Sequence, residues 1–280
     1  YHVWLSEIML QQTRVEAVKG YYARFLSELP TIEALAACPP DRLTKLWEGL
    51  GYYSRVWNLQ KAAKGIMDEH GGAFPETYEA VRALPGVGDY TAGAICSICF
   101  DLPTPAVDGN VLRVLSRVME DGAPVTNQKT KTAYREALLP LYEAGSRGTL
   151  TQALMELGAM VCVPNGAPKC EICPLRDVCL VNAHGTWEKY PVKEAKKAKR
   201  EEEKTIFYLT CDGCLAVRKR ESRGLLAGLW ELPNVEGKLD AAQALSFAEK
   251  AGCEPAELLK SVERVHVFTH IIWRMRCYYI

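Results

Sequence analysis

The chain has 280 residues, of which 48% are hydrophobic and 24% charged, and its formal net charge is zero. This length and composition favour two globular domains and exclude a disordered or fibrous chain. No apolar run is long enough to span a membrane, and the balanced charge excludes the strongly basic surface typical of many nucleic-acid-binding domains.

Residues 1–190 are predicted to form a helical domain, because apolar residues recur there at intervals of three and four, separated by Gly- and Pro-containing breaks. The clearest helical segments are 15–29, 40–50, 58–70, 89–100, 109–120 and 150–161. Residues 1–10 read as the inside of a further helix, and 274–280 stop inside a strand-like run. We therefore expect the natural protein to extend beyond both ends, where targeting signals would lie.

The stretch 191–204 combines many charges with almost no large apolar residue, so we predict an exposed linker there. The pattern then changes to that of a smaller α+β domain over 205–280, which we expect to be truncated. Its strand-like segments are 205–211, 214–220 and 265–280, and its helical segment is 241–252. Asp212-Gly213, between the first two, is a strong signal for a two-residue hairpin turn.

Four cysteines lie in one short loop rich in proline and glycine, in the pattern C-x7-C-x2-C-x5-C: Cys162, Cys170, Cys173 and Cys179. Such thiolates can surround a tetrahedral zinc ion or a [4Fe–4S] cluster. Zinc ribbons more often show two C-x2-C pairs a dozen or more residues apart, so we favour the cluster over zinc. Four unrelated buried cysteines are a third interpretation.

The remaining cysteines favour a reducing compartment. The total of eleven is odd, and several cysteines lie in apolar segments, where a thiol behaves as a small hydrophobe. Cys211 and Cys214 resemble half of a redox or zinc site, but no second ligand pair follows, so we interpret them as strand residues facing each other across the hairpin. If the protein is bacterial, we expect it in the cytoplasm, associated with the nucleoid.

The segment 84–88, Leu-Pro-Gly-Val-Gly, lies between two predicted helices. Gly86 and Gly88 have no Cβ to keep the backbone away from a phosphate, and the amides that open the next helix point their positive dipole end at an anion. Gly-rich turns between helices are common, so this motif alone indicates only an anion-binding turn.

Two carboxylates lie in environments that would separate their pKa values. Glu7 lies among apolar residues, where loss of water would raise its pKa. Asp108 is at an N-cap position, where helix amides would keep it ionised. Such a pair suits the hydrolysis of a glycosidic bond. From the residues alone, a solvated helix position for Glu7 and a plain cap for Asp108 are the simpler interpretations.

In this order, the hairpin, DYTAGAI, VDGNVLRVLSR and the four-cysteine loop resemble the helix-hairpin-helix DNA glycosylases, the superfamily of endonuclease III. The opening WLSEIMLQQT narrows the resemblance to the adenine DNA glycosylases of the MutY type, and it extends over essentially the whole chain. One departure is that seven residues separate Cys162 from Cys170, where the family commonly has six. The resemblance implies a [4Fe–4S] cofactor, a monomer, and double-stranded DNA containing an adenine:8-oxoguanine mispair as partner.

The resemblance also implies catalytic roles. Glu7 would protonate the adenine and handle the water, and Asp108 would stabilise the sugar cation or capture it covalently. Tyr90 occupies the position of the Schiff-base lysine of bifunctional relatives. Because a phenol cannot form that imine, we expect hydrolysis without efficient strand cleavage; simple packing is the alternative role for Tyr90.

Further positions would bind the substrate or the DNA: Leu10, Gln12, Tyr52, Gly86, Gly88, Asn110 and Gln152. The two glutamines would line the adenine pocket, where an amide can read a purine edge, and Asn110 would hydrogen-bond beside Asp108. Tyr52 would enter the base stack when adenine is flipped out. A plain core or surface role is the alternative for each of them.

The segment 224–237 resembles the Nudix fold of the family's C-terminal domain. The helix that follows has Glu249 but lacks the R-E-x-x-E-E set that holds Mg²⁺, so we expect a nucleotide reader rather than a hydrolase. Phe268-Thr269-His270 matches the family's loop for 8-oxoguanine, with Thr where relatives often have Ser.

The sequence therefore predicts hydrolysis of the N-glycosidic bond of adenine mispaired with 8-oxoguanine or guanine. One alternative is an endonuclease III-like pyrimidine glycosylase with lyase activity, against which Tyr90 and the second domain argue. The other is a non-catalytic iron–sulfur sensor of DNA damage, against which the presence of both Glu7 and Asp108 argues.

Overall fold

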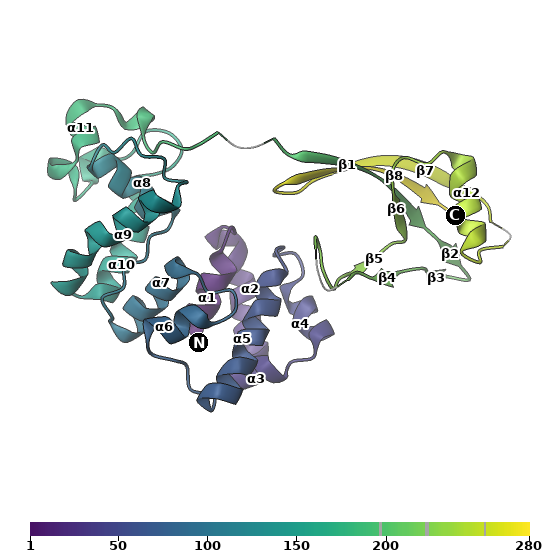
Figure 1. Cartoon of the computed structure of the whole chain (residues 1–280), viewed down its shortest axis with the longest axis horizontal. Coiled ribbons are helices and arrows are strands. Elements are labelled where there is room, and N and C mark those ends of the chain that lie inside the picture. Colours follow the sequence, from purple (N-terminus) through teal and green to yellow (C-terminus); the bar gives the residue numbers. More distant parts are fainter. Residues whose placement is uncertain (196–197, 222–223, 255) are drawn as a thin grey trace. The chain divides into compact units, whose positions relative to one another are not determined.

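The computed structural model describes residues 1–280 except 196–197, 222–223 and 255, and it divides into two compact units (Figure 1). Unit 1 is Tyr1–Glu194 and unit 2 is Ala195–Ile280. The exposed linker expected up to residue 204 ends earlier, because strand β1 begins at Arg200. Backbone pairing with β8 holds these charged residues in a strand, and their composition alone does not reveal that partner.

Unit 1 is helical, as predicted from its apolar spacing. Its α-helices are α1 (His2–Leu10), α2 (Val15–Glu28), α3 (Ile32–Ala37), α4 (Pro40–Trp47), α5 (Ser54–His70), α6 (Tyr78–Ala83), α7 (Asp89–Phe100), α8 (Gly109–Val118), α9 (Gln128–Glu143), α10 (Arg147–Glu156) and α11 (Leu180–His184). Short turns of other helix types are η1 (Leu157–Val161), η2 (Cys170–Ile172), η3 (Arg176–Val178) and η4 (Trp187–Lys189). The helix expected over 150–161 ends at Glu156 and continues as the π-helical turn η1.

Local capping sets several of these helix starts. The hydroxyls of Thr31 and Thr77 accept hydrogen bonds from the backbone amides of Ala34 and Ala80, which would otherwise lack an acceptor. Pro40 is the first residue of α4, where a missing amide hydrogen does no harm. These starts therefore follow from residues within one turn.

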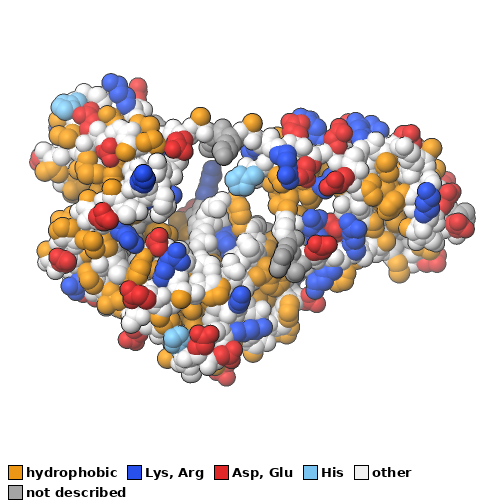
Figure 2. Space-filling model, in the orientation of Figure 1, with side chains coloured by type: hydrophobic (Ala, Val, Ile, Leu, Met, Phe, Trp, Pro, Cys, Tyr) orange, Lys and Arg blue, Asp and Glu red, His pale blue; other side chains and the backbone are white. Residues whose placement is uncertain are grey.

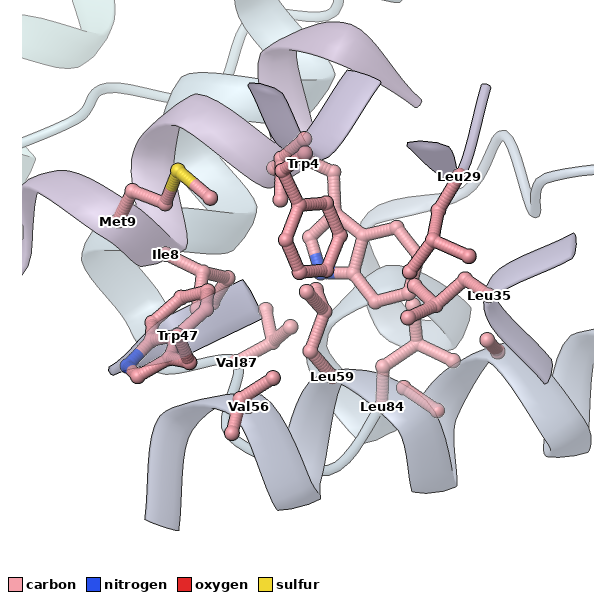
Figure 3. Packing of buried hydrophobic residues seen from close by; sticks show 14 of the residues in the cluster. Trp4, Ile8, Met9, Leu29, Leu35, Trp47, Val56, Leu59, Leu84 and Val87 are labelled. Atoms are coloured by element: carbon pink, nitrogen blue, oxygen red, sulfur yellow. The ribbon is translucent and has the colours of Figure 1, made fainter. Parts of the chain in front are cut away.

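The helices of unit 1 bury three groups of apolar side chains, of which the smallest contains Leu112, Val125 and Tyr134. The largest group belongs to α1–α7 and includes Trp4, Leu59 and Leu84, which pack together in Figure 3. A smaller cluster joins α8, α9 and α10 through Val111, Leu138, Tyr142 and Leu154. Because each group packs separately, a space between them can remain open to solvent.

Unit 2 is an α+β domain, as predicted. Its strands are β1 (Arg200–Tyr208), β2 (Thr210–Cys211), β3 (Cys214–Leu215), β4 (Arg218–Lys219), β5 (Trp230–Glu231), β6 (Asn234–Glu236), β7 (Lys260–Val267) and β8 (Ile271–Tyr279). The main sheet has the order β6-β1-β8-β7, in which β1 and β8 are parallel and the other pairs antiparallel. Helix α12 (Ala241–Lys250) packs Ala244 and Ala248 against Phe207 and Tyr278 of this sheet.

The predicted hairpin turn is present, with Asp212 at φ 49° and Gly213 at φ 77° and Cys211 opposite Cys214. Its strands are only two residues long, because residues 205–208 pair with β8 instead. Basic and acidic side chains are interspersed on the face of the molecule seen in Figure 2. Over the described residues, none of the helices has the length and apolar character needed to cross a membrane.

Candidate active site

A cleft of about 1020 Å³ opens in unit 1. Its walls come from α1 and the residues that follow it, from the starts of α7 and α8, and from α9 and α10. The predicted substrate or catalytic residues that line it are Glu7, Leu10, Gln12, Gly88, Tyr90, Asp108, Asn110 and Gln152. The fold thus brings together side chains that are far apart in the sequence.

Glu7 lies on α1 and is only 8% exposed. Its Oε2 accepts a hydrogen bond of 2.6 Å from the hydroxyl of Tyr90. Burial raises the pKa of Glu7; the Tyr90 hydrogen bond lowers it to a smaller extent, and the negative charge of Asp108 adds to the rise. An upward shift is the direction predicted for a carboxyl group among the apolar neighbours of Glu7.

Asp108 is the N-cap of α8, as predicted. One carboxylate oxygen accepts the amide of Val111 at 2.8 Å and the other accepts the side-chain amide of Asn110 at 2.8 Å. These bonds favour the ionised form, but they do not set the direction of the pKa shift. Burial is the largest influence and raises the pKa of Asp108 in spite of the hydrogen bonds.

Tyr90 lies on the first turn of α7, within the electrostatic influence of both carboxylates. Its hydroxyl contacts Glu7 rather than Asp108, but the charges of both carboxylates help burial to raise the pKa of Tyr90. The phenol therefore stays protonated and acts as a hydrogen-bond donor to Glu7.

Asn110 is fixed by a residue that the sequence did not point to. Arg113 Nη2 donates to Asn110 Oδ1 at 2.9 Å and to the carbonyl of Gly158 at 2.6 Å. Its Nε donates to the carbonyl of Cys162 at 2.7 Å. A Cβ on Gly158 would approach the Asn110 backbone to 3.0 Å, so η1 and α8 are in close contact at this point.

The predicted adenine-reading glutamines lie on two walls of the cleft. Gln12 has a positive φ of 57° and an exposed side chain, and Gln152 donates to the carbonyl of Gly148 at 3.2 Å. Gln11, which was not predicted, also lines the cleft and donates to the Thr91 hydroxyl at 3.4 Å. Gln11, Gln12 and Gln152 therefore line the same cleft as Glu7.

The two hairpin glycines differ in their structural requirement. Gly86 has φ +79°, and a Cβ there would lie 2.9 Å from the Cβ of Asn58. Gly88 is the N-cap of α7 at φ −95°, and a Cβ there would meet nothing within 4 Å. Only the first position needs glycine for the turn itself.

Tyr52 lies in the turn between α4 and α5, with φ 48° and 45% exposure, and it is not among the residues that line the cleft. Beneath it, the buried Arg55 donates to five carbonyls: those of Ile8, Met9, Gln11, Leu50 and Gly51, at 2.7–3.2 Å. One guanidinium thus ties the end of α1 to the turn that presents Tyr52.

The four cysteines of the loop line one small, apolar cavity of about 30 Å³ together with side chains such as Val114 and Leu157. Arg117 Nη1 donates to Cys162 Sγ at 3.3 Å. Burial, followed by the neighbouring cysteines, raises the pKa of Cys170. Within the described chain, no group of three or more His, Cys, Asp or Glu side chains could hold a metal ion.

The predicted lesion-reading residues lie in unit 2, in the loop that joins β7 to β8. The Phe268 ring is in edge-on contact with His266 and Trp273, at centroid distances of 4.3 and 5.0 Å. The carbonyl of His270 accepts the Arg200 amide at 3.0 Å, and the side chains of Thr269 and His270 are exposed. The loop is thus anchored at its base and exposed at its tip.

Comparison with known proteins agrees with this arrangement. Residues 5–140 match the HhH-GPD superfamily of base excision DNA repair proteins, and residues 205–280 match the NUDIX domain. The adenine DNA glycosylase of Buchnera aphidicola subsp. Schizaphis graminum is 36% identical over 88% of this chain and 70% of its own length. The chain belongs to the adenine DNA glycosylase family.

Other adenine DNA glycosylases are longer. Those of Mus musculus and Homo sapiens are 35% and 36% identical over 97% of this chain, which spans 62% and 59% of their lengths. A thermostable thymine-DNA glycosylase of known structure is 27% identical, with a TM-score of 0.56 over 66% of this chain and 84% of its own. Endonuclease III in complex with DNA, at 22% identity and a TM-score of 0.57, covers 65% of this chain and 84% of its own and shares the fold.

The sequence did not point to Arg55 and Arg113, which hold parts of the site of this adenine DNA glycosylase family member in place. A signal was present, because each arginine sits in a helix beside buried apolar positions. Side chains so placed often satisfy backbone carbonyls at helix ends. Which carbonyls they reach depends on segments distant in sequence.

Proposed function

We propose that this chain acts, as a monomer, on double-stranded DNA and hydrolyses the N-glycosidic bond of adenine mispaired with 8-oxoguanine. The observation that carries the proposal is the buried Glu7, hydrogen-bonded to Tyr90 in a cleft that Asp108 also lines. Membership of the adenine DNA glycosylase family indicates adenine as the base that is released. The pair of carboxylates suits hydrolysis of the bond between this base and its sugar.

Glu7 would donate its proton to the departing adenine and afterwards accept one from water. Asp108 would face the positive charge that develops on the sugar, with Asn110 and the Val111 amide holding its oxygens. The gain in charge stabilisation arises only in the transition state, so a buried carboxylate suits this role better than a solvated one.

The proposed reaction is monofunctional. Tyr90 occupies the first turn of α7 and is bonded to Glu7, so it offers a donor hydroxyl and no amine for imine formation. We expect base release to leave an intact strand with an abasic site. Sugar–phosphate cleavage that keeps pace with base release would contradict this assignment.

Cys162, Cys170, Cys173 and Cys179 would hold the [4Fe–4S] cluster. Their shared cavity and four-thiol donor set fit such a cluster, in which the thiolates surround several irons rather than one ion. When bound, it would cross-link the loop next to η1 and α8. Iron and sulfide analysis of the purified protein should find about four of each per chain; one zinc and no iron would refute the cluster.

Phe268, Thr269 and His270 would read 8-oxoguanine, because their loop is anchored to β1 and its tip is exposed. Replacing both Thr269 and His270 with alanine should reduce the preference for 8-oxoguanine over guanine opposite adenine by roughly 1–3 kcal/mol. Single-turnover adenine release from the two duplexes, side by side, measures this preference. An unchanged ratio would remove the loop from the reading of the lesion.

The decisive experiment is adenine release from duplexes in which adenine faces 8-oxoguanine, guanine or thymine. We expect fast release for the first, slower release for the second and almost none for the third. Glu7→Gln should abolish release but still bind the mispaired duplex, and Asp108→Asn should lower the rate by about 10²–10³. Wild-type release of a pyrimidine instead of adenine would overturn the proposal.

A further inference from the structure

We propose that Lys131 and Arg135, on the α9 wall of the cleft, bind a backbone phosphate of the DNA strand that carries the adenine. The site deepens the proposed function, on which it rests, by assigning how the substrate strand is held beside the carboxylates.

The described residues that line the cleft contain four carboxylates, Glu7, Asp89, Asp108 and Glu156, and two cations, Lys131 and Arg135. DNA brings a negative phosphate on each side of every sugar. An adenosine sugar placed between Glu7 and Asp108 therefore brings phosphates into a cleft in which carboxyl groups outnumber cations. The two cations on the wall would attract these phosphates.

Both cations lie on one face of α9. Lys131 and Arg135 are four residues apart, and Gln128 and Thr132 of the same helix line the cleft with them. Lys129, two residues before Lys131 and therefore on another face of α9, is exposed and does not line the cleft. The basic face is therefore directed at the site rather than spread around the helix.

Lys131 is available for a ligand. Its side chain is half-buried, and in the described part of the chain its ammonium has no hydrogen-bond acceptor or ion-pair partner. A lysine that is partly removed from water without a partner is readily satisfied by an incoming anion.

Arg135 is held in place instead. Its Nη1 donates to the Tyr78 hydroxyl at 3.1 Å, and that hydroxyl contacts Asp89 Oδ1 at 3.4 Å. Asp89 is itself paired with Arg82 at 2.6 Å, which offsets its charge. Arg135 thus keeps donors for a phosphate while α9 is tied to the start of α7.

The N-terminus of α8 does not offer an equivalent phosphate site. Asp108 already occupies it with a carboxylate that accepts the Val111 amide. A helix N-terminus capped by a negative group repels a second anion. Among the described residues that line the cleft, Lys131 and Arg135 of α9 are the cations that a phosphate could meet.

The test measures binding of the full-length chain, in a Glu7→Gln background that prevents turnover, to a duplex with adenine opposite 8-oxoguanine. Fluorescence anisotropy at several salt concentrations gives the slope of log affinity against log salt. Lys131→Gln should weaken binding about tenfold at low salt and reduce the slope by about one, as expected for one lost phosphate contact. Arg135→Gln should act in the same direction.

Two matched variants and one chemical probe sharpen the result. Lys131→Arg should restore affinity and slope, and Lys129→Gln on the same helix should change neither. Single phosphates of the adenine strand can be replaced with neutral methylphosphonates. At one position this replacement should weaken DNA binding by the protein that retains Lys131, but not by the Lys131→Gln variant. Equal behaviour of Lys131→Gln and Lys129→Gln, or additive losses at every phosphate, would overturn the site.

The outcome is separable from that of the proposed function. Adenine release by the wild-type chain tests the chemistry, whereas the binding slope tests the α9 site without any turnover. Normal adenine release with an unchanged slope in Lys131→Gln would refute the phosphate site alone.

Discussion

The Tyr90 hydroxyl and burial have opposite effects on Glu7. Burial raises the pKa of Glu7, and the hydrogen bond from Tyr90 lowers it because it stabilises the charged form. Tyr90→Phe removes only the second effect, so the pKa of Glu7 should rise further. If protonated Glu7 is the acid, activity falls as pH rises through this pKa, and the basic limb of the rate profile should move to higher pH in the variant.

Single-turnover rates of adenine release between about pH 5 and pH 9 would measure this shift. Tyr134→Phe is a suitable control, since it removes another phenol of unit 1, which donates to Asp121 rather than Glu7 and does not line the cleft. A profile that moves to lower pH in Tyr90→Phe, or does not move, would mean that Glu7 is not the acid.

The raised pKa values of Glu7 and Asp108 should also affect how the free energy of unfolding depends on pH. Burial raises the pKa of both Glu7 and Asp108, so the folded state binds their protons more tightly than the unfolded state does. The free energy of unfolding should therefore fall as pH rises from the ordinary carboxyl range through the raised pKa values. Glu7→Gln should be more stable than wild type at neutral pH and less sensitive to pH.

Urea unfolding at pH 5 and pH 8 measures this difference. Glu16→Gln, an exposed pair partner of Lys19, serves as the control and should change little. Greater loss of stability in Glu7→Gln at pH 8 than at pH 5 would contradict the argument.

Residue-scale predictions from sequence succeeded where the cause was local. The cap at Asp108 could be predicted from its position before Gly109-Asn110. The apolar neighbours of Glu7 indicated burial but left a solvated helix position as the simpler interpretation, and the structure buries the residue. The rise in the pKa of Asp108 could not be predicted, because it results from burial by helices that are distant in the sequence. The contacts of Arg113 with η1 have the same distant origin.

At the scale of elements, the hairpin distinguishes its two glycines. Gly86→Ser forces a positive φ and a close contact with Asn58, so it should destabilise the fold by about 1–3 kcal/mol. Gly88→Ser, the same substitution at a free N-cap, should stay within about 0.5 kcal/mol of wild type because serine caps helices well. Equal losses of stability in urea would show that the positive φ of Gly86 is not the cause.

Arg55 connects two elements that present predicted site residues. Arg55→Met would leave up to five carbonyls without their donor, so we expect a loss of about 2–3 kcal/mol in the free energy of unfolding. Arg42→Met, which breaks an exposed pair with Glu28, should stay within about 1 kcal/mol of wild type. If the two variants unfold at the same urea concentration, the carbonyl contacts of Arg55 are of little energetic weight.

Elements with a regular apolar spacing were predictable, and α7 begins and ends where the spacing placed it. Helix α9 was not predicted, because Pro140 interrupts its pattern and its packing against α8 and α10 provides much of its support. The start of β1 was placed too late because its charged residues are held by a partner strand from the far end of unit 2. Contacts with elements distant in the sequence thus determine both the formation of α9 and the start of β1.

On the scale of the whole molecule, the two units have separate apolar cores. A chain that stops after Glu194 should therefore fold, keep its four-cysteine loop and release adenine slowly, while its preference for 8-oxoguanine over guanine should shrink towards none. Circular dichroism and adenine release from both duplexes would test this. A chain that stops after residue 204 should be more prone to aggregate, because the first half of β1 would lack its partner strand β8.

Strand β8 is the last strand made in the part of the chain described here, yet it lies between β1 and β7 at the centre of the sheet. A nascent chain on the ribosome can complete the helical unit first, while β1, including the buried Phe207, waits for its parallel neighbour. During that interval the edge of β1 that β8 later covers is unpaired and available to chaperones and to other nascent chains, although the other edge can already pair with β6. Translation that pauses within β7 would prolong this exposure, so aggregation during synthesis should arise from unit 2 even when the finished protein is stable.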